Sequence, residues 1–199
     1  MASILKIGVW NANGLTQRTK ELKYFLYEQN IDVMLISETH FIKGNYLNIP
    51  YYNTYNIQHS DGSAHGGSAI IVKSTIKHHS NENFSQKHLQ TTSITIEDWT
   101  GPIILAAIYS PSRHSITQEQ HTNFFKTLGT RFVAGGDYNA KHPWGILEYY
   151  FKAESCFDLS SDHSPILVTL STTVVKRNPQ LYIAKKLTGI YLEKLSKSI

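Results

Sequence analysis

Short apolar runs that end in polar residues recur along the chain, and this pattern limits the folds that the sequence can adopt. Residues 5–10 form an apolar run that breaks at Asn-Ala-Asn-Gly, which is typical of a strand ending in a turn. Residues 32–36 form a second such run, which is followed by Glu38. Apolar runs of this length, bounded by turn residues, fit buried strands better than helices. Polar side chains placed after such strands would lie at the edge of a sheet.

Helical spacing appears between these two runs and again further along the chain. Residues 16–29 carry Leu22, Phe25 and Leu26 at helical intervals, so the chain is expected to begin as strand, helix, strand. Two hairpins, a second helix and two further strands are predicted at residues 51–57 with 67–73, 93–98 with 102–109, 117–128, 131–134 and 165–170. This order favours an α/β fold, a two-sheet α/β sandwich flanked by helices. Leu187, Tyr191, Leu192 and Leu195 predict an amphipathic helix in the tail.

Composition narrows the class of protein and its partners. The chain has 199 residues, of which 41% are hydrophobic and 17% charged, an ordinary globular balance for one domain with a tail. A net charge of +4 with ten histidines favours a polyanionic partner such as DNA. The single cysteine, Cys156, excludes an internal disulfide framework and fits an intracellular location, in the nucleus or cytoplasm. No apolar run reaches the roughly 18 residues that a bilayer requires, so no membrane contact is expected.

The polar residues that follow the strands suit the hydrolysis of a phosphodiester if the strand ends converge on one rim. Taken singly, each is an ordinary turn former. As a set they comprise Asn11, Asn13, Glu38, Tyr109, Asp137, Asn139, Asp162 and His163. Glu38 with the amide oxygen of Asn11 or Asn13 could bind Mg²⁺, or Mn²⁺ in its place, because hard cations prefer oxygen ligands. Asp137 is the candidate to orient or deprotonate a water, and Asn139 to bond the phosphate. Tyr109 and the Asp162–His163 pair could stabilise the pentacovalent phosphorus. No His-x-x-x-His pair supports a zinc hydrolase.

Six motifs in order resemble the endonuclease/exonuclease/phosphatase superfamily. They are Trp-Asn-Ala-Asn-Gly at 10–14, Ser-Glu-Thr-His at 37–40, Gly-Gly-Ser-Ala-Ile at 66–70, Ile-Tyr-Ser-Pro at 108–111, Gly-Asp-Tyr-Asn-Ala-Lys-His at 136–142 and Ser-Asp-His-Ser-Pro at 161–165. The last two motifs look more narrowly like the endonuclease domain of jockey-type retrotransposons. This resemblance implies DNA as substrate, no small-molecule cofactor, and the site roles given above. It also implies DNA contacts from Lys141, His142 and Arg113.

The resemblance covers residues 4 to 171, so we expect a domain over residues 1–172 and a basic linker over 173–199. It also implies that a segment is missing after Gly145. Relatives carry a long stretch there, including an aspartate that supports the catalytic histidine, whereas only residues 146–153 intervene here. Two alternatives therefore stand beside an active endonuclease. One is a non-catalytic remnant that binds nucleic acid weakly, and the other is the same fold acting on a phosphorylated lipid head group.

Overall fold

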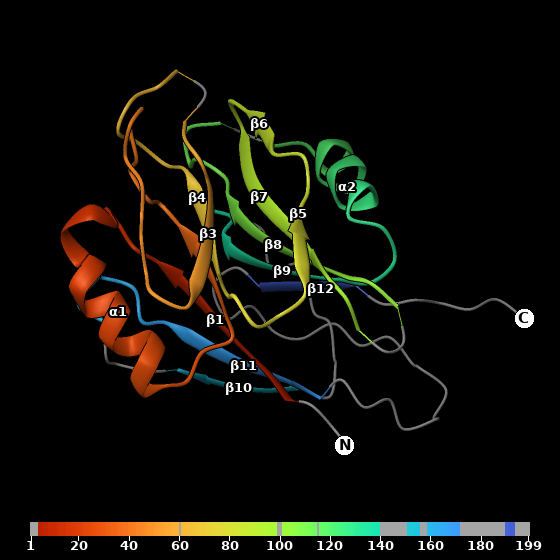
Figure 1. Cartoon of the computed structure of the whole chain (residues 1–199). Coiled ribbons are helices and arrows are strands. Elements are labelled where there is room, and N and C mark those ends of the chain that lie inside the picture. Colours follow the sequence, from red (N-terminus) through yellow and green to blue (C-terminus); the bar gives the residue numbers. More distant parts are fainter. Residues whose placement is uncertain are drawn as a thin grey trace, which may run out of the picture.

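The apolar runs of the sequence form the strands of two β-sheets that pack face to face, with one helix on the outer side of each sheet (Figure 1). The structure is a computed structural model and describes residues 4–59, 61–98, 101–114, 116–139, 151–155, 159–171 and 190–193. This arrangement is the two-sheet α/β sandwich that the sequence predicts. Within the described part of the chain, no helix is long and apolar enough to cross a membrane.

The first sheet has the strand order β10-β11-β1-β2-β4-β3. Its strands are β1 (Ile4–Asn11), β2 (Val33–Ser37), β3 (Tyr52–Ile57), β4 (Ser68–Lys73), β10 (Phe151–Ser155) and β11 (Ile166–Ser171). β1 and β2 are parallel neighbours, with Asn11 opposite Ser37. The other pairs in this sheet are antiparallel. The carboxyl ends of β1 and β2 therefore meet at one edge.

The second sheet has the strand order β12-β9-β8-β7-β5, and β6 also pairs with β7. Its strands are β5 (His78–Ser80), β6 (Phe84–Gln86), β7 (Leu89–Ile96), β8 (Ile103–Tyr109), β9 (Phe132–Asp137) and β12 (Ile190–Glu193). β8 and β9 are its parallel pair, with Tyr109 opposite Asp137. Each sheet thus contributes one parallel pair whose last residues are polar.

Alternation along the strands separates the core into layers, because successive side chains of a strand point to opposite faces. The layer between the sheets contains Val9, Leu35, Ile70, Leu105 and Val133 among its buried residues. This apolar layer holds the two sheets together through the hydrophobic effect. At one end of the sandwich, the inward rows of β1, β8 and β9 end in polar residues.

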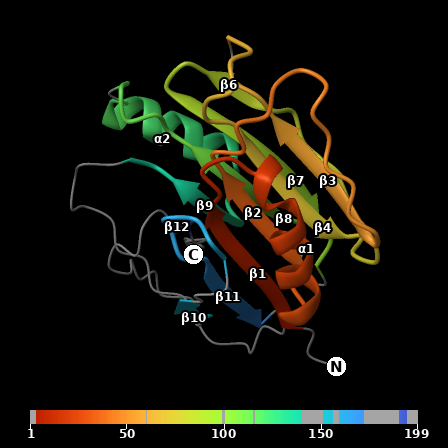
Figure 2. The same cartoon turned by 90° about the vertical axis from the view of Figure 1, so that its left-hand side faces the viewer.

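The two helices cover the outer faces of the sheets, as Figure 2 shows from a second side. α1 (Thr19–Glu28), preceded by the short 3₁₀ turn η1 (Thr16–Arg18), buries Leu22, Phe25 and Leu26 against the first sheet. α2 (Gln118–Thr127) buries Phe124 against the second sheet. A capping box between Thr117 and Gln120 fixes where α2 begins.

The main strands and both helices lie within a few residues of their predicted positions, and the exceptions are informative. β5 and β6 are short and mostly polar, and the sequence pattern does not reveal them. The prediction of an amphipathic helix in the tail is wrong at residues 190–193, which form β12 and pair with β9. The segment after Gly145 lies outside the described residues as far as residue 150. The next described strand, β10, covers the edge of β11.

Candidate active site

The inward-facing rows of both sheets end in polar side chains at the same end of the sandwich. In the first sheet, Asn11 follows Val9 along the inner face of β1. In the second sheet, Tyr109 follows Ala107 on β8, and Asp137 follows Gly135 on β9. The strand ends therefore converge on one rim, as the sequence predicts.

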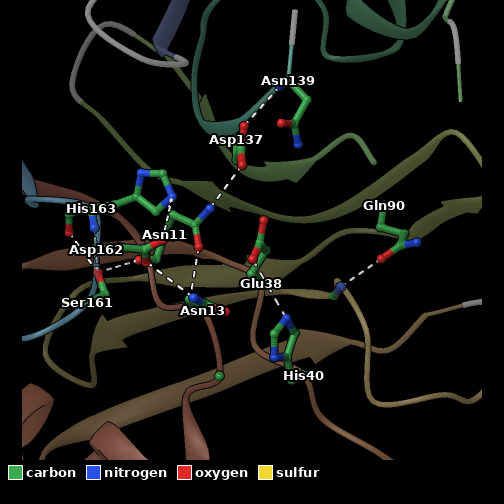
Figure 3. Close-up of polar contacts among 12 residues, drawn as sticks. Asn11, Asn13, Glu38, His40, Gln90, Asp137, Asn139, Ser161, Asp162 and His163 are labelled. Atoms are coloured by element: carbon green, nitrogen blue, oxygen red, sulfur yellow. Dashed lines mark hydrogen bonds and ion pairs between the residues drawn. The ribbon is translucent and has the colours of Figure 1, made fainter. Parts of the chain in front are cut away.

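A direct hydrogen bond joins the two sheets at this rim. Asn11 Nδ2 donates to Asp137 Oδ2 over 2.9 Å, as Figure 3 shows. The other carboxylate oxygen, Oδ1, accepts the backbone N–H of Asn139 over 2.9 Å. Both oxygens of Asp137 are thus held in place, which fixes the orientation of its carboxylate. The Asn139 side chain is anchored in turn by a 2.9 Å hydrogen bond from its Nδ2 to the carbonyl oxygen of Ser110.

Glu38 lies directly after β2, in a backbone conformation that non-glycine residues rarely adopt. Its φ is +54°, and His40 has the same value. Such strained positions persist where the surrounding structure enforces them, and they gather at functional sites. Burial raises the pKa of the Glu38 carboxyl group above its ordinary value of 4.5, and the neighbouring carboxylate of Asp137 raises it further. A hydrogen bond with Asn11 and the charge of His163 act in the opposite direction.

Tyr109 presents a half-buried phenol to the same group of side chains. Burial raises its pKa to about 12, and the nearby carboxylates of Glu38 and Asp137 add to the effect. The exposed Arg113 side chain acts in the opposite direction, which places its charge within electrostatic range of the phenol. At neutral pH the Tyr109 hydroxyl therefore remains protonated and available as a hydrogen-bond donor.

Asp162 and His163 reach the rim on the loop before β11, and Ser161 fastens this loop to β1. The buried indole of Trp10 donates its Nε1–H to Ser161 Oγ over 2.7 Å, and the backbone N–H of His163 donates to the same oxygen over 3.2 Å. Asn13 Nδ2 donates to Asp162 Oδ1 over 3.2 Å, and this bond lowers the pKa of the Asp162 carboxyl group.

The residues at the rim fit a hard divalent cation. Among the described residues, no three His, Cys, Asp or Glu side chains cluster as a ready-made metal site. Glu38 and Asp137 nevertheless bring two carboxylates together, where the charge of Asp137 helps to raise the pKa of Glu38, and a cation would relieve this repulsion. Mg²⁺ commonly uses one or two carboxylates and retains several waters, so this sparse oxygen donor set suits it.

Most of the predicted site residues come together at this rim. Asn11, Asn13, Glu38, Tyr109, Asp137, Asn139, Asp162 and His163 all border the rim. Lys141 and His142 lie outside the described residues. The sequence reveals no role for Ser161, although this residue stands in the Ser-Asp-His-Ser-Pro motif. It also reveals none for Gln90, the only signal of which is an amide among hydroxyl and aliphatic residues.

The fold and the rim together define an α/β sandwich whose polar site lies at the carboxyl ends of two parallel strand pairs. Residues 8–156 match the Endonuclease/Exonuclease/phosphatase family, and the chain belongs to this family. It is similar to the RNA-directed DNA polymerase from the mobile element jockey of Drosophila funebris, with 41% identity over 140 residues. That match covers 70% of this chain and 15% of the relative, so the chain spans about a seventh of the relative's length.

Solved structures share the fold at low sequence identity. The endonuclease domain of TRAS1, a telomere-specific non-LTR retrotransposon, superimposes with a TM-score of 0.64 and 15% identity, covering 85% of this chain and 99% of that one. The AP endonuclease LMAP from Leishmania major superimposes with a TM-score of 0.61 and 10% identity, covering 84% and 88% of the two chains.

Proposed function

We propose that this chain is a divalent-metal-dependent DNA endonuclease that nicks target DNA for retrotransposition. The observation that carries the proposal is the hydrogen bond from Asn11 to Asp137, which joins the two sheets with Glu38 beside it. The similarity of this chain to the jockey protein and to the TRAS1 endonuclease domain supports DNA as the substrate over a lipid head group.

Glu38, with the amide oxygen of Asn11 or Asn13, would hold Mg²⁺, or Mn²⁺ in its place. When bound, the ion supplies positive charge that neutralises the phosphate and its transition state. The raised pKa of Glu38 fits this role, because a cation favours the ionised carboxylate that burial and Asp137 disfavour.

The remaining side chains account for the chemistry at phosphorus. The oriented carboxylate of Asp137 accepts a proton from a water as the water oxygen attacks phosphorus and the bond to the leaving sugar oxygen breaks. The protonated phenol of Tyr109 donates a hydrogen bond to a phosphate oxygen. His163, beside Asp162, stabilises the charge of the pentacovalent phosphorus, and Asn139 bonds the phosphate. Arg113, Lys141 and His142 would contact the DNA backbone.

A second candidate function, weak nucleic-acid binding without catalysis, is favoured by the surroundings of His163. In the described part of the chain, the ion pair of His163 is with its neighbour Asp162, at 3.7 Å, and both side chains are about half exposed or more. An exposed imidazole whose carboxylate neighbour lies 3.7 Å away is poorly oriented, and hydrolytic sites lose much of their rate when the orienting acid is removed. This agrees with the expectation from the family resemblance that the segment with the supporting aspartate is missing after Gly145.

A plasmid-nicking assay distinguishes the two functions. Purified chain is incubated with supercoiled plasmid and Mg²⁺, and then with EDTA. We expect nicking that EDTA abolishes and that Glu38→Ala lowers at least roughly 100-fold, because the main ligand is lost. Glu97→Ala, at an exposed glutamate just beyond the far end of β7, is the matched control and should nick at the parent rate. A folded chain that binds DNA but leaves the plasmid supercoiled would establish the non-catalytic function instead.

A further inference from the structure

We propose that Gln90 is a positioning residue that fixes Glu38 on the first sheet relative to Tyr109 on the second. This inference rests on the proposed metal-dependent function. It concerns the contact between the sheets behind the rim, where the side chain of Gln90 reaches from β7 to the turn before β4, as Figure 3 shows.

Gln90 occupies a position where a core residue would be expected. It lies on the inner face of β7 in the same row as Ile94 and Ile96, and it is fully buried. Its Oε1 accepts the backbone N–H of Gly67 over 2.7 Å. Its Nε2 is buried and, among the described residues, has no hydrogen-bond partner. A buried amide with an unpaired N–H donor lowers the stability of a core. Packing therefore does not explain why an amide stands at this position, whereas the hydrogen bond from Gly67 to its Oε1 does.

On the first sheet, the turn that Gln90 holds is bonded to the residues directly after Glu38. The backbone N–H of His40 donates to Gly66 O over 2.9 Å, and that of Thr39 donates to Gly67 O over 3.4 Å. These bonds hold the strained backbone on which Glu38 has its positive φ. The Gly66–Gly67 turn is therefore the support on which the Glu38 carboxylate is placed.

On the second sheet, the same turn touches Tyr109. Gln90 and Tyr109 are directly paired across β7 and β8, which puts their side chains on one face. The turn passes so close that a Cβ on Gly66 would lie 2.4 Å from Cε1 of the Tyr109 ring and 2.9 Å from Gln90 Oε1. Glycine is required here, since its φ is +63° as well. One buried contact thus sets the spacing between a proposed metal ligand and a proposed phosphate donor.

A purely structural link between the sheets lies two residues further along β7 and provides the control. Thr92 Oγ1 and Ser68 Oγ are 3.0 Å apart, and the pair is as buried as Gln90. Thr92 Oγ1 also lies 3.1 Å from the carbonyl oxygen of Ser68, the first residue of β4. Thr92→Val therefore removes inter-sheet hydrogen bonds to Ser68 but leaves the hydrogen bond from Gly67 to Gln90 in place.

The test compares Gln90→Met, which keeps the size of the side chain and removes the amide, with Thr92→Val. Mn²⁺ binding to each full-length chain is measured from the loss of the free-ion electron paramagnetic resonance signal, beside thermal melting without metal and plasmid nicking against Mg²⁺ concentration. We expect Gln90→Met to raise the Mn²⁺ dissociation constant and the Mg²⁺ midpoint about tenfold, and Thr92→Val to change them less than about twofold, at similar losses of melting temperature. Gln90→Glu keeps an acceptor oxygen for Gly67 and should bind Mn²⁺ within roughly threefold of the parent.

The outcomes separate this inference from the proposed function. A parent chain that binds no Mn²⁺ would overturn both. A parent chain that binds Mn²⁺, with equal affinities in Gln90→Met and Thr92→Val, would overturn the positioning role and leave the endonuclease proposal intact. If Gln90→Met does not melt cooperatively, Gln90→Glu decides, because a tenfold weaker Mn²⁺ affinity despite the retained acceptor would contradict the role of Gln90.

Discussion

The carboxyl group of Glu38 is half-buried and lies beside that of Asp137. This placement lowers the stability of the metal-free fold, although the proposed function requires it. Both groups have to be ionised for the proposed chemistry, whereas burial and the charge of Asp137 raise the pKa of Glu38 in the metal-free fold. Because the folded-state pKa is raised, the folded chain binds the proton more tightly than the unfolded chain does. Ionised Glu38 therefore lowers the free energy of unfolding above that pKa, and the penalty disappears as the pH falls below about 4.5, its ordinary value.

Glu38→Gln should accordingly stabilise the metal-free protein while it abolishes nicking. In EDTA at pH 7 to 8 we expect the melting temperature to rise by roughly 2 to 4 °C, the shift that about 1 kcal/mol produces in a domain of this size. The gain should shrink as the pH is lowered toward 4.5. Thermal melting followed by circular dichroism at several pH values checks this, and a variant less stable than the parent at pH 8 would contradict the assigned cause.

At the scale of elements, the loop before β11 depends on one hydroxyl group. Ser161 Oγ accepts the indole N–H of the buried Trp10 and lies 2.9 Å from the carbonyl oxygen of Asn11, so it ties the Asp162–His163 segment to the end of β1. The neighbouring Ser160 instead donates from its Oγ to Glu21 Oε2 on α1 over 2.7 Å, at the surface. Ser161 therefore makes a part-buried contact with β1, whereas Ser160 makes an exposed contact with α1.

Ser161→Ala should leave the Trp10 N–H unpaired and lower the free energy of unfolding by about 1 to 3 kcal/mol. It should also slow nicking, because His163 loses the attachment of its backbone. Ser160→Ala, the control, is expected to change stability by less than about 0.5 kcal/mol. Urea unfolding and the plasmid assay measure both effects, and equal behaviour of the two variants would disprove the anchoring role.

Elements were predictable where the local pattern was strong. β1, β2 and α1 follow from apolar runs and helical spacing alone. β5 and β6 are mostly polar segments of three residues each that become strands because β7 offers them a partner. β12 carries the apolar spacing of a helix, yet it pairs with β9 because backbone groups at a sheet edge also need partners.

At the scale of the whole molecule, the site exists only because two separate sheets pack at a fixed distance. Asn11 and Glu38 come from the first sheet, and Tyr109 and Asp137 from the second. The sheets approach closely at Gly135 on β9, where an added Cβ would lie 2.8 Å from Cγ2 of Val9 and 3.2 Å from Cδ1 of Leu35. This glycine lies two residues before Asp137. Its lack of a side chain therefore lets the two halves of the site lie close together.

Gly135→Ala should push the sheets apart beneath the rim. We expect the free energy of unfolding to fall by about 1 to 3 kcal/mol, together with weaker Mn²⁺ binding. Ala134→Val overpacks the adjacent position on the outer face of β9, beneath α2, and should lower stability similarly while Mn²⁺ affinity is unchanged. Equal Mn²⁺ affinities in the two variants would show that sheet spacing does not control the site.

The sequence by itself determined the main strands, the two helices α1 and α2 and the polar residues at the strand ends, because apolar periodicity and turn chemistry act over a few neighbouring residues. It also marked Asn11, Glu38, Asp137 and His163 as one candidate set. Only the tertiary structure decided that Gln90 and Ser161 hold this set in place, since hydrogen bonds between distant segments leave no local pattern. The raised pKa of Glu38 likewise arises from burial and from a carboxylate on the other sheet, which exist only after the sheets have packed.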